Sequence, residues 1–289
     1  MFQSAALMRQ RSVSHEESHM SKPGRGLGRV PSANRDDDEK YLLRRALPLS
    51  RPPAPAVNSW DLPASQLRFQ GATGTCVEHG GIHFLKCAPL RTRSEKVLPE
   101  QFSLYRKIVL VDEWSSNDSE ATADVSGLQS GTSVRALMKV LTDLGFIEGY
   151  GWEFTYSPAS EWVRRNGPVI AGTNWYESMF NLTTEGFAKI TPTTSLSGGH
   201  CYLWVGSNTK RGIDLWANSW EKWGIDRKAF TSKPGTVTLA NSTQRGFFMT
   251  SSEDTERLIH EDGEITTATE KRWKPKAVTL PQPQARALS

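Results

Sequence analysis

The chain has 289 residues, of which 37% are hydrophobic, and a formal net charge of +4 at pH 7. This length allows one large domain or two small ones. The basic excess lies within residues 1–60, where ten lysines and arginines accompany six acids, so the balanced remainder excludes a basic face suited to nucleic acid. No apolar run is long enough for a signal-peptide core or a membrane span, and we expect neither nucleic acid nor a membrane as a partner.

Changes in composition along the chain predict three parts. Residues 1–59 are polar, basic and rich in Gly, Pro and Ser, which predicts a disordered arm because few apolar groups are present to offset the entropy of ordering. Residues 60–250 have the composition of a folded domain, and residues 251–289 read as a polar, Pro-containing tail. We expect these tails to dock, if at all, on their own domain or on a partner assembly.

The first helix of the domain is expected to begin at Cys76. Gly71 and Gly74 give the preceding loop the conformational freedom of a turn. Gly80 and Gly81 weaken this helix, because glycine destabilises a helix by about 1 kcal/mol relative to alanine. Its apolar positions are Val77, Phe84, Leu85 and Ala88.

A second helix is expected after a polar loop. Residues 98–111 are apolar-rich and residues 115–130 are polar. Ser133 or Thr132 can then cap an amphipathic helix, which Gly145 follows. Its apolar residues recur at helical spacing and are Val134, Leu137, Met138, Leu141 and Leu144.

The second half of the chain predicts mainly strands. Residues 161–165 predict a short helix, and the later apolar segments are short, β-branched or aromatic, and separated by turn residues. These segments are 168–172, 201–205, 212–217, 236–239 and 246–249. Helices in the first half and strands in the second indicate an α+β fold with segregated lobes.

Cys76 is the candidate nucleophile. At a helix N-terminus the unpaired N–H groups and the helix dipole favour the thiolate, which is the reactive form. Six residues earlier, Gln70 offers an amide donor that a short loop can fold back toward the thiol. A nucleophile and a donor are the minimum needed to attack a carbonyl and stabilise the oxyanion. Cys76 also fits an inert thiol in a turn, so a partner base is required.

A base and an orienting residue occur in the strand half. His200 precedes an apolar strand, and histidine is the usual general base for a thiol. Asn218 ends the next strand, where its amide oxygen can fix the tautomer of a histidine. Trp220 follows and can keep water from that bond. Each residue alone also fits an ordinary structural role, and only their combination indicates catalysis.

These segments resemble the motifs of the papain-like cysteine peptidases, most closely the bacterial and phage members. Residues 70–76 match Gln-Gly-x-x-Gly-x-Cys, residues 199–200 match Gly-His, and residues 218–224 match Asn-Ser-Trp-Gly followed by Trp-Gly. Residues 98–102 and 130–133 also look like segments of such members.

The spacing of the motifs agrees with this resemblance. His200 and Asn218 lie 124 and 142 residues after Cys76, close to the family's offset of about 130–150 residues. The likeness covers residues 60–250.

The resemblance implies a two-lobe α+β fold, with an N-terminal helical lobe, a C-terminal antiparallel β lobe and the site in the cleft between them. It implies that Cys76 is the nucleophile and His200 the base, in a thiolate–imidazolium pair that Asn218 orients. Gln70 and the Cys76 N–H would form the oxyanion hole. The residues expected on the substrate side are Gly131, Gly199 and Trp220. The reaction would be endopeptidase hydrolysis of a peptide or protein through an acyl-enzyme, with no cofactor or metal.

Four positions depart from the family pattern. Thr73 stands where a cysteine is usual, Val77 where an aromatic residue is usual, and Glu221 where glycine is usual. The residues near Gly131 match the family's glycine wall only loosely. These changes leave the three triad positions intact and affect the predicted cleft walls.

Other functions remain open at the level of sequence. His79 and His83 are spaced to share a zinc ion, whereas Cys76 and Cys87 lie about 16 Å apart along a helix, too far for one coordination sphere. A papain-like fold can also serve as a non-catalytic binding or structural component of a larger assembly such as a virion, and the same triad can transfer an acyl group. Three cysteines argue against a disulfide framework and indicate a reducing, cytoplasmic or virion-associated location.

Overall fold

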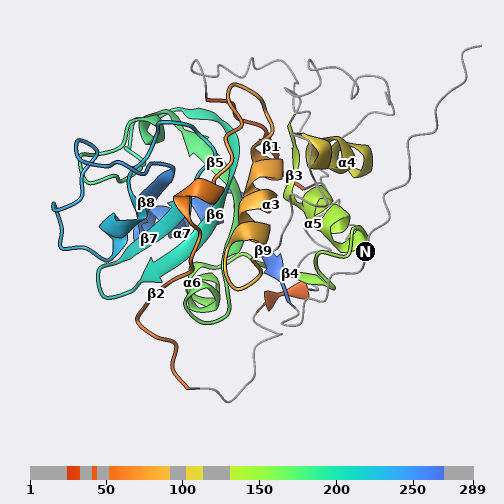
Figure 1. Ribbon diagram of the computed structural model, residues 1–289, viewed down its shortest axis with the longest axis horizontal. Helices are drawn as coiled ribbons and strands as arrows, with labels where there is room; N and C mark the ends of the chain where they lie inside the picture. The colour runs from red at the N-terminus through yellow and green to blue at the C-terminus, as the bar shows by residue number, and fades with distance from the viewer. Residues whose placement is uncertain (1–24, 33–40, 44–51, 92–101, 113–130, 270–289) are drawn as a thin grey trace, which may run out of the picture.

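The computed structural model describes residues 25–32, 41–43, 52–91, 102–112 and 131–269. The polar loop predicted at 115–130 lies outside these residues. The described chain forms a helical lobe and an antiparallel β lobe, which confirms the predicted α+β fold (Figure 1). The helical lobe contains α3 (Cys76–Lys86), α4 (Ser103–Val111) and α5 (Val134–Asp143), and α3 lies between the sheet and the other two helices.

The β lobe is built on an antiparallel sheet with the order β4-β9-β5-β6-β7-β8, and β2 also pairs with β6. Its strands are β2 (Val57–Ser59), β4 (Tyr150–Glu153), β5 (Val169–Tyr176), β6 (Leu196–Asn208), β7 (Ile213–Ala217), β8 (Phe247–Ser251) and β9 (Glu264–Ala268). Helix α6 (Tyr156–Arg165) packs on β2 and β6, and α7 (Ser252–His260) packs on β7 and β8.

Smaller elements connect the two lobes and the loops. A two-stranded parallel sheet joins β1 (Arg29–Val30) to β3 (Thr132–Ser133), and these strands come from distant parts of the sequence. The connections also contain the short 3-10 helices η2 (Ala64–Gln66), η5 (Glu177–Phe180) and η6 (Arg227–Phe230).

Helix α3 begins at Cys76 as predicted, although it contains two glycines. A Cβ at Gly80 would lie 2.9 Å from the sulfur of Cys201 in β6, and a Cβ at Gly81 would lie 2.6 Å from a methyl carbon of Leu137 in α5. The absent side chains let α3 approach both the sheet and α5. Close packing on two sides therefore compensates for the low helix propensity of these residues.

Helix α5 is the predicted amphipathic helix. The hydroxyl of its N-cap Ser133 accepts a hydrogen bond from the Ala136 N–H at 3.2 Å. Gly145 has a φ of +71°, the left-handed conformation that favours glycine just beyond a helix. The apolar segment at 98–111 contains α4, and the helix predicted at 161–165 is the second half of α6.

Most of the predicted strands are confirmed, with two differences. β6 begins at Leu196, so His200 lies inside the strand and not at its start. Residues 236–239 form a turn instead of a strand. The Thr238 N–H donates to Asn241 Oδ1 at 2.7 Å, and this side chain–backbone bond competes with strand pairing.

The folded domain extends beyond the predicted boundaries at residues 60 and 250. β2 precedes the first boundary, whereas α7 and β9 follow the second, and β9 is an interior strand between β4 and β5. The prediction of an unstructured arm and tail is wrong for these segments. β9 looks like a tail because it is polar, but the hydroxyls of Thr266 and Thr267 donate to the carbonyls of Gly151 and Pro168, both at 2.9 Å. These bonds satisfy polar groups that burial would otherwise penalise.

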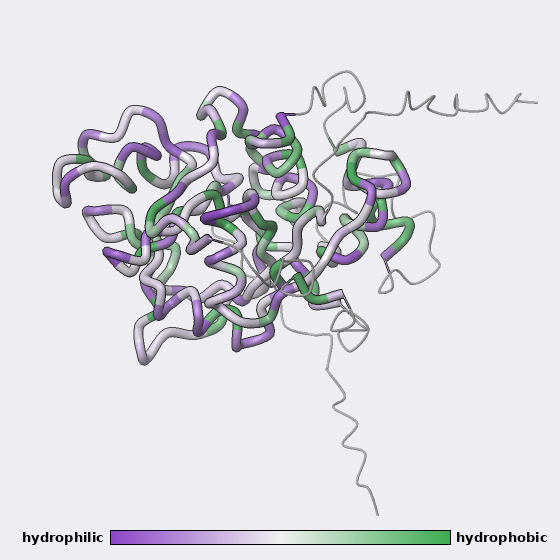
Figure 2. The backbone as a smooth tube through the Cα atoms, turned by 90° about the horizontal axis from the view of Figure 1, so that it is seen from below, coloured by the Kyte–Doolittle hydropathy of each residue, from purple (hydrophilic) through white to green (hydrophobic). Residues whose placement is uncertain are grey.

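Apolar side chains cover both faces of the sheet. On β6, Cys201, Leu203 and Val205 belong to the core against α3, whereas Tyr202 and Trp204 belong to an aromatic core on the opposite face. Figure 2 shows hydrophobic stretches interspersed with hydrophilic ones along the described chain. Among the described residues, no helix combines the length and the apolar character needed to cross a bilayer.

Candidate active site

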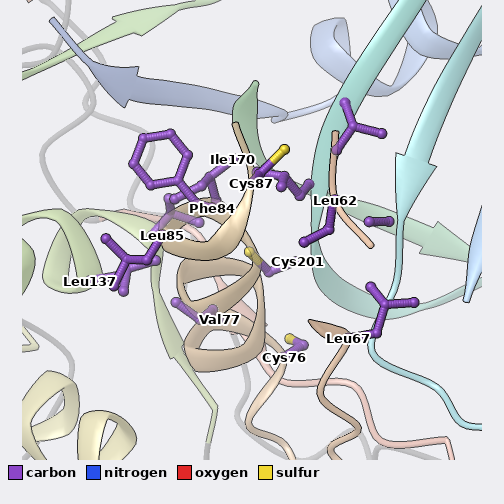
Figure 3. Packing of buried hydrophobic residues seen from close by; sticks show 14 of the residues in the cluster. Leu62, Leu67, Cys76, Val77, Phe84, Leu85, Cys87, Leu137, Ile170 and Cys201 are labelled. Carbon is purple, nitrogen blue, oxygen red and sulfur yellow. The ribbon is translucent and has the colours of Figure 1, made fainter. Parts of the chain in front are cut away.

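Cys76 occupies the first position of α3, directly after the loop 70–75. In Figure 3 it lies on the side of the helix near Cys201 of β6, whereas Val77 lies on the side toward Leu137 of α5. The exposed fraction of Cys76 is 0%. The start of the helix therefore presents the thiol to the junction between the lobes and not to bulk solvent.

His200 and Asn218 come together because β6 and β7 pair with each other. His200 Nε2 is 2.8 Å from Asn218 Oδ1. The same Oδ1 accepts a hydrogen bond from the Ser219 N–H at 2.8 Å, so Nε2–H is the donor to it. In a neutral imidazole this tautomer leaves Nδ1 as a proton acceptor.

Two tryptophans enclose the imidazole. Trp220 stacks on His200 with a centroid distance of 4.4 Å and 15° between the planes, and Trp175 meets it edge-on at 5.1 Å. Both indoles are buried. Trp220 therefore helps to exclude water from the His200–Asn218 pair.

The hydrogen bond between thiol and imidazole is not formed in this structure. His200 Nδ1 is buried and has no hydrogen-bond partner among the described residues. The Cys76 thiol instead interacts with backbone groups of Cys201, Gly28 and Val77. Because Cys201 directly follows His200, the structure places the thiol beside the β6 segment that carries the imidazole.

Gln70 lies between the loop before Cys76 and the strand end that carries Asn218. Its Oε1 accepts a hydrogen bond from the hydroxyl of Ser219. Its Nε2 donates to the carbonyl oxygens of Thr73 at 2.6 Å and of Gly26 at 3.0 Å. The amide expected to face an oxyanion is therefore directed at a peptide carbonyl of the N-terminal region.

That region fills the site. Residues 25–32, named here the cleft segment, bond to both lobes through Gly28. The Gly28 N–H donates to the Gly199 carbonyl at 3.1 Å, and the Gly28 carbonyl accepts from the Thr132 N–H at 2.8 Å. A Cβ at Gly28 would lie 1.8 Å from the carbonyl oxygen of Gly74, so no larger residue fits there without movement.

The three residues predicted on the substrate side all contact the cleft segment. A Cβ at Gly131 would lie 2.3 Å from the carbonyl oxygen of Gly28, and Gly199 accepts the backbone bond from the same residue. Trp220 Nε1 donates to the Gly26 carbonyl at 3.2 Å. Gly131, Gly199 and Trp220 therefore all contact Gly26 or Gly28 of the cleft segment.

Burial determines the protonation of the thiol and the imidazole. It raises the pKa of the Cys76 thiol to about 12, and the nearby backbone groups and the Arg29 charge oppose this only in part. It lowers the pKa of His200 to about 3, although the bond to Asn218 acts in the opposite direction. An ion pair requires the thiol to be the stronger acid, so both groups are neutral here. This differs from the thiolate–imidazolium pair that the resemblance implies.

Comparison with known proteins identifies the fold. No protein-family model and no curated protein matches the sequence. Among solved structures, xylellain, a cysteine protease from Xylella fastidiosa, aligns with 86% of this chain and 97% of its own, at a TM-score of 0.52 and 16% sequence identity. This chain has the fold of the papain-like cysteine proteases.

Two further solved structures align less well. Digestive procathepsin L 3 from the larval midgut of Tenebrio molitor covers 84% of this chain and 75% of its own, with a TM-score of 0.45 and 12% identity. Procathepsin B S9 from Trypanosoma congolense covers 83% and 81%, with a TM-score of 0.45 and 10% identity. The fold assignment does not depend on these two.

The papain-like fold accommodates the departures noted in the sequence. Thr73, which replaces a usual cysteine, closes the loop by donating from its hydroxyl to the Gln70 carbonyl at 2.7 Å. Val77 is buried on the α5 side of the helix, away from the cleft. Glu221 is exposed. None of these three side chains lies between Cys76 and His200.

Sequence reasoning missed three charged residues of the site. Asp112 accepts hydrogen bonds from the Ser133 N–H at 2.7 Å and from the Thr132 hydroxyl, and it thereby positions the backbone beside Gly131. Arg29 and Glu264 form a buried ion pair in the cleft. Both belong to regions predicted as tails, and no motif in the sequence links them.

The histidines considered for a zinc site have protein partners. His79 Nδ1 lies 2.9 Å from the Thr75 carbonyl, and His83 Nε2 accepts from the Arg68 N–H at 2.9 Å. Both histidines belong to α3 and are buried in the protein, and no group of three potential metal ligands occurs within the described ranges. Their bonds give both histidines a structural role.

Acid is expected to destabilise this fold as the pH falls from about 6.5 toward 3. Burial lowers the pKa of His83 to about 3 and that of His79 to about 4, whereas an unfolded chain protonates near 6.5. The unfolded state then binds more protons, so the stability contributed by each neutral histidine is complete above pH 6.5 and is lost as the pH approaches the folded-state pKa.

Urea unfolding at pH 7, 5 and 4 measures this effect. We expect the free energy of unfolding of His83→Gln to fall less steeply as the pH is lowered than that of the parent protein. The two slopes should differ by about 1.4 kcal/mol per pH unit, because the unfolded variant binds one proton fewer. The glutamine retains an acceptor for the Arg68 N–H. Parallel pH profiles for the two proteins would contradict the burial-shifted pKa of His83.

Proposed function

We propose that this protein hydrolyses peptide bonds through a thiol, with Cys76 as nucleophile, His200 as base and Asn218 as the residue that orients the base. The observation that carries the proposal is the tautomer of His200. Nε2–H donates to Asn218 Oδ1 at 2.8 Å, and the other nitrogen, Nδ1, is a buried acceptor that has no hydrogen-bond partner within the part of the chain that the structure describes. A triad requires this arrangement of a general base.

The proposed reaction proceeds in two stages. The Cys76 sulfur attacks the carbonyl carbon of a peptide and the thiol proton moves to His200 Nδ1. The C=O electron pair moves onto the oxygen, which Gln70 Nε2 and the Cys76 N–H stabilise. His200 then donates the proton to the leaving amine as the C–N bond breaks. Water, deprotonated by the same nitrogen, attacks the thioester and releases the acid and the free thiol.

The cleft segment supports a peptide substrate. It lies extended between the lobes, bonds to backbone groups on both sides and directs a carbonyl at Gln70. The xylellain fold supports the same reaction class. The three cysteines are free, which fits a reducing compartment such as the cytoplasm.

One observation favours a second candidate, a non-catalytic papain-like binding or structural protein. The site is filled, and burial raises the pKa of the Cys76 thiol to about 12, which leaves it unreactive in this state. A scaffold would keep it so under all conditions, whereas an enzyme must reach a second state in which the cleft is open.

Alkylation of Cys76 by iodoacetamide and by an epoxide across pH 4–10, followed by peptide mapping, separates these candidates. The full chain and its Gly28→Ala variant are compared, because the added Cβ disfavours the filled cleft. We expect fast labelling of the variant well below the ordinary thiol pKa of about 8.5, slowed in a His200→Ala background. A labelling rate that rises only near pH 8.5 and is the same in the His200→Ala background would support the non-catalytic binding or structural protein.

A further inference from the structure

A second free thiol lies beside the candidate nucleophile. Cys201 directly follows His200 in β6, and its backbone interacts with the Cys76 thiol. Burial raises the pKa of the Cys201 thiol, and a negative charge on Cys76 raises it further. The sulfurs are therefore close enough for the charge of one to affect the other. Both thiols are free, and the proposed triad makes no use of Cys201.

Both sulfurs lie on the side of α3 that faces the sheet (Figure 3). Side chains alternate along β6, so Cys201 packs in the core against α3, whereas His200 stacks on Trp220 on the opposite face. A Cβ at Gly80 would lie 2.9 Å from Cys201 Sγ. Gly80 is four residues after Cys76, and such positions are neighbours on one helix face, with about 5–6 Å between Cβ atoms. The Cys201 sulfur thus lies about one helical turn from the Cys76 side chain.

The glycine at position 80 provides the space that the Cys201 sulfur occupies. Apart from this sulfur, the nearest atoms to a Cβ at Gly80 are a methyl carbon of Ile170 and the backbone N of Tyr202, both at 3.9 Å. A disulfide spans Cα separations of about 4.4–6.8 Å. Contact between the Cys201 backbone and the Cys76 side chain is compatible with that range. Rotation about the Cα–Cβ bond of Cys201 then redirects its sulfur along the helix toward Cys76.

We propose that Cys201 is a resolving cysteine, which captures Cys76 after its oxidation by a hydroperoxide and forms a reversible disulfide with it. This inference goes beyond the proposed peptidase function, because it needs only the two thiols and an open cleft. In a reducing compartment such a disulfide is transient, as is typical of redox-sensing pairs. The pair would switch the nucleophile off under oxidising conditions and preserve it.

The proposed chemistry has two steps. With the cleft open, the Cys76 sulfur attacks hydrogen peroxide. An S–O bond forms as the O–O bond breaks, the sulfur loses two electrons to the peroxide, and the thiol proton leaves with the released hydroxide as water. The Cys201 sulfur then attacks the sulfur of this sulfenic acid. The S–S bond forms, the S–O bond breaks, and the hydroxyl group leaves with the Cys201 proton as a second water.

The position of Cys201 protects the nucleophile from irreversible oxidation. A sulfenic acid that meets no thiol is oxidised further to the sulfinic and sulfonic acids, which ordinary thiols do not reduce. A disulfide, in contrast, is returned to two thiols by a dithiol, which is itself oxidised. Loss of the Cys201 thiol should therefore convert a reversible inactivation of Cys76 into a permanent one.

Controlled oxidation followed by mapping of the peptides tests the proposal. The reduced full chain and its Gly28→Ala variant are treated with hydrogen peroxide, the remaining thiols are alkylated in denaturant, and the digest is analysed without reduction. We expect intact mass to show the loss of two hydrogens and the digest to contain a peptide in which Cys76 is joined to Cys201. Gly28→Ala should form this peptide faster, because the added Cβ disfavours the filled cleft.

Matched variants assign the effect to one thiol. In Cys201→Ala we expect added oxygen atoms on Cys76 instead of the disulfide. The fraction of Cys76 that iodoacetamide labels after treatment with dithiothreitol should fall at least about fivefold relative to the parent. Cys87→Ala removes another buried free thiol, from the opposite end of α3, and should leave both the disulfide and the recovery unchanged. The disulfide in the parent needs no substitution, so it decides the matter even if Cys201→Ala fails to fold.

Three results would overturn the role of Cys201. They are recovery of Cys76 that is equal in the parent and in Cys201→Ala, a disulfide that joins Cys76 to Cys87 or to a second molecule, and resistance of Cys76 to peroxide even in Gly28→Ala. Any of the first two leaves the proposed peptidase function standing, because hydrolysis by the reduced protein is measured separately. In that case Cys201 only fills the space beside Gly80.

Discussion

Replacing Cys76 by alanine is expected to lower kcat/KM for peptide hydrolysis by at least about 10⁴-fold. The sulfur is the atom that forms the acyl-enzyme, and water held by the remaining groups is a much weaker nucleophile. The measurement is release of a fluorophore from a peptide substrate, with the full chain and its Gly28→Ala variant. His200→Ala should cause a similar loss, because residues that act as one unit are not additive.

The matched control for this loss is Cys87→Ala. Cys87 is also a free, fully buried thiol, and burial raises its pKa as well, but it follows the last turn of α3 instead of the first. We expect its removal to leave kcat/KM within about threefold of the parent. An equal loss in both variants would indicate damage to the helix, and unchanged hydrolysis in Cys76→Ala would exclude the thiol mechanism.

Gly28→Ala is expected to raise both the rate of Cys76 alkylation and the rate of hydrolysis by about 5- to 150-fold. The added methyl group would lie 1.8 Å from the Gly74 carbonyl oxygen and cannot rotate away. Overpacking of this kind costs about 1–3 kcal/mol. Here it destabilises only the closed state, in which the cleft segment lies against Gly74. The fold increase is that energy converted at about 1.4 kcal/mol per factor of ten.

Gly167→Ala provides the matched control. A Cβ at Gly167 would lie 3.5 Å from its nearest neighbour, an ordinary contact with Pro89, so neither rate should change. If Gly28→Ala leaves both rates at the parental values while the protein remains folded, the cleft segment does not limit access to Cys76.

Opening the cleft has a second consequence, for the charges of the triad. Burial is the largest cause of both the high pKa of Cys76 and the low pKa of His200. Water readmitted to the cleft favours the charged form of each group, so the two pKa values approach one another. The alkylation profile of Gly28→Ala should accordingly shift to lower pH as well as to higher rates.

The sequence alone identified the catalytic candidates and the elements that carry them. The start of α3 at Cys76, the cap at Ser133 and the end of β7 before Asn218 depend on neighbouring residues, because helix caps and strand ends are local. The predicted bond between His200 and Asn218 also needs only two adjacent strands. Patterns of a few residues were therefore sufficient to predict these elements and the pairing of His200 with Asn218.

Only the tertiary structure decided the charge state and occupancy of the cleft. Glu264 forms an ion pair with Arg29, which lies 235 positions earlier in the sequence. Both residues belong to segments whose composition predicts tails. Nothing local predicts such a contact, because it requires β9 to enter the sheet between β4 and β5. The protonation of Cys76 depends in the same way on burial under Gly28, since a pKa reflects every group packed around the thiol and not its place in a motif.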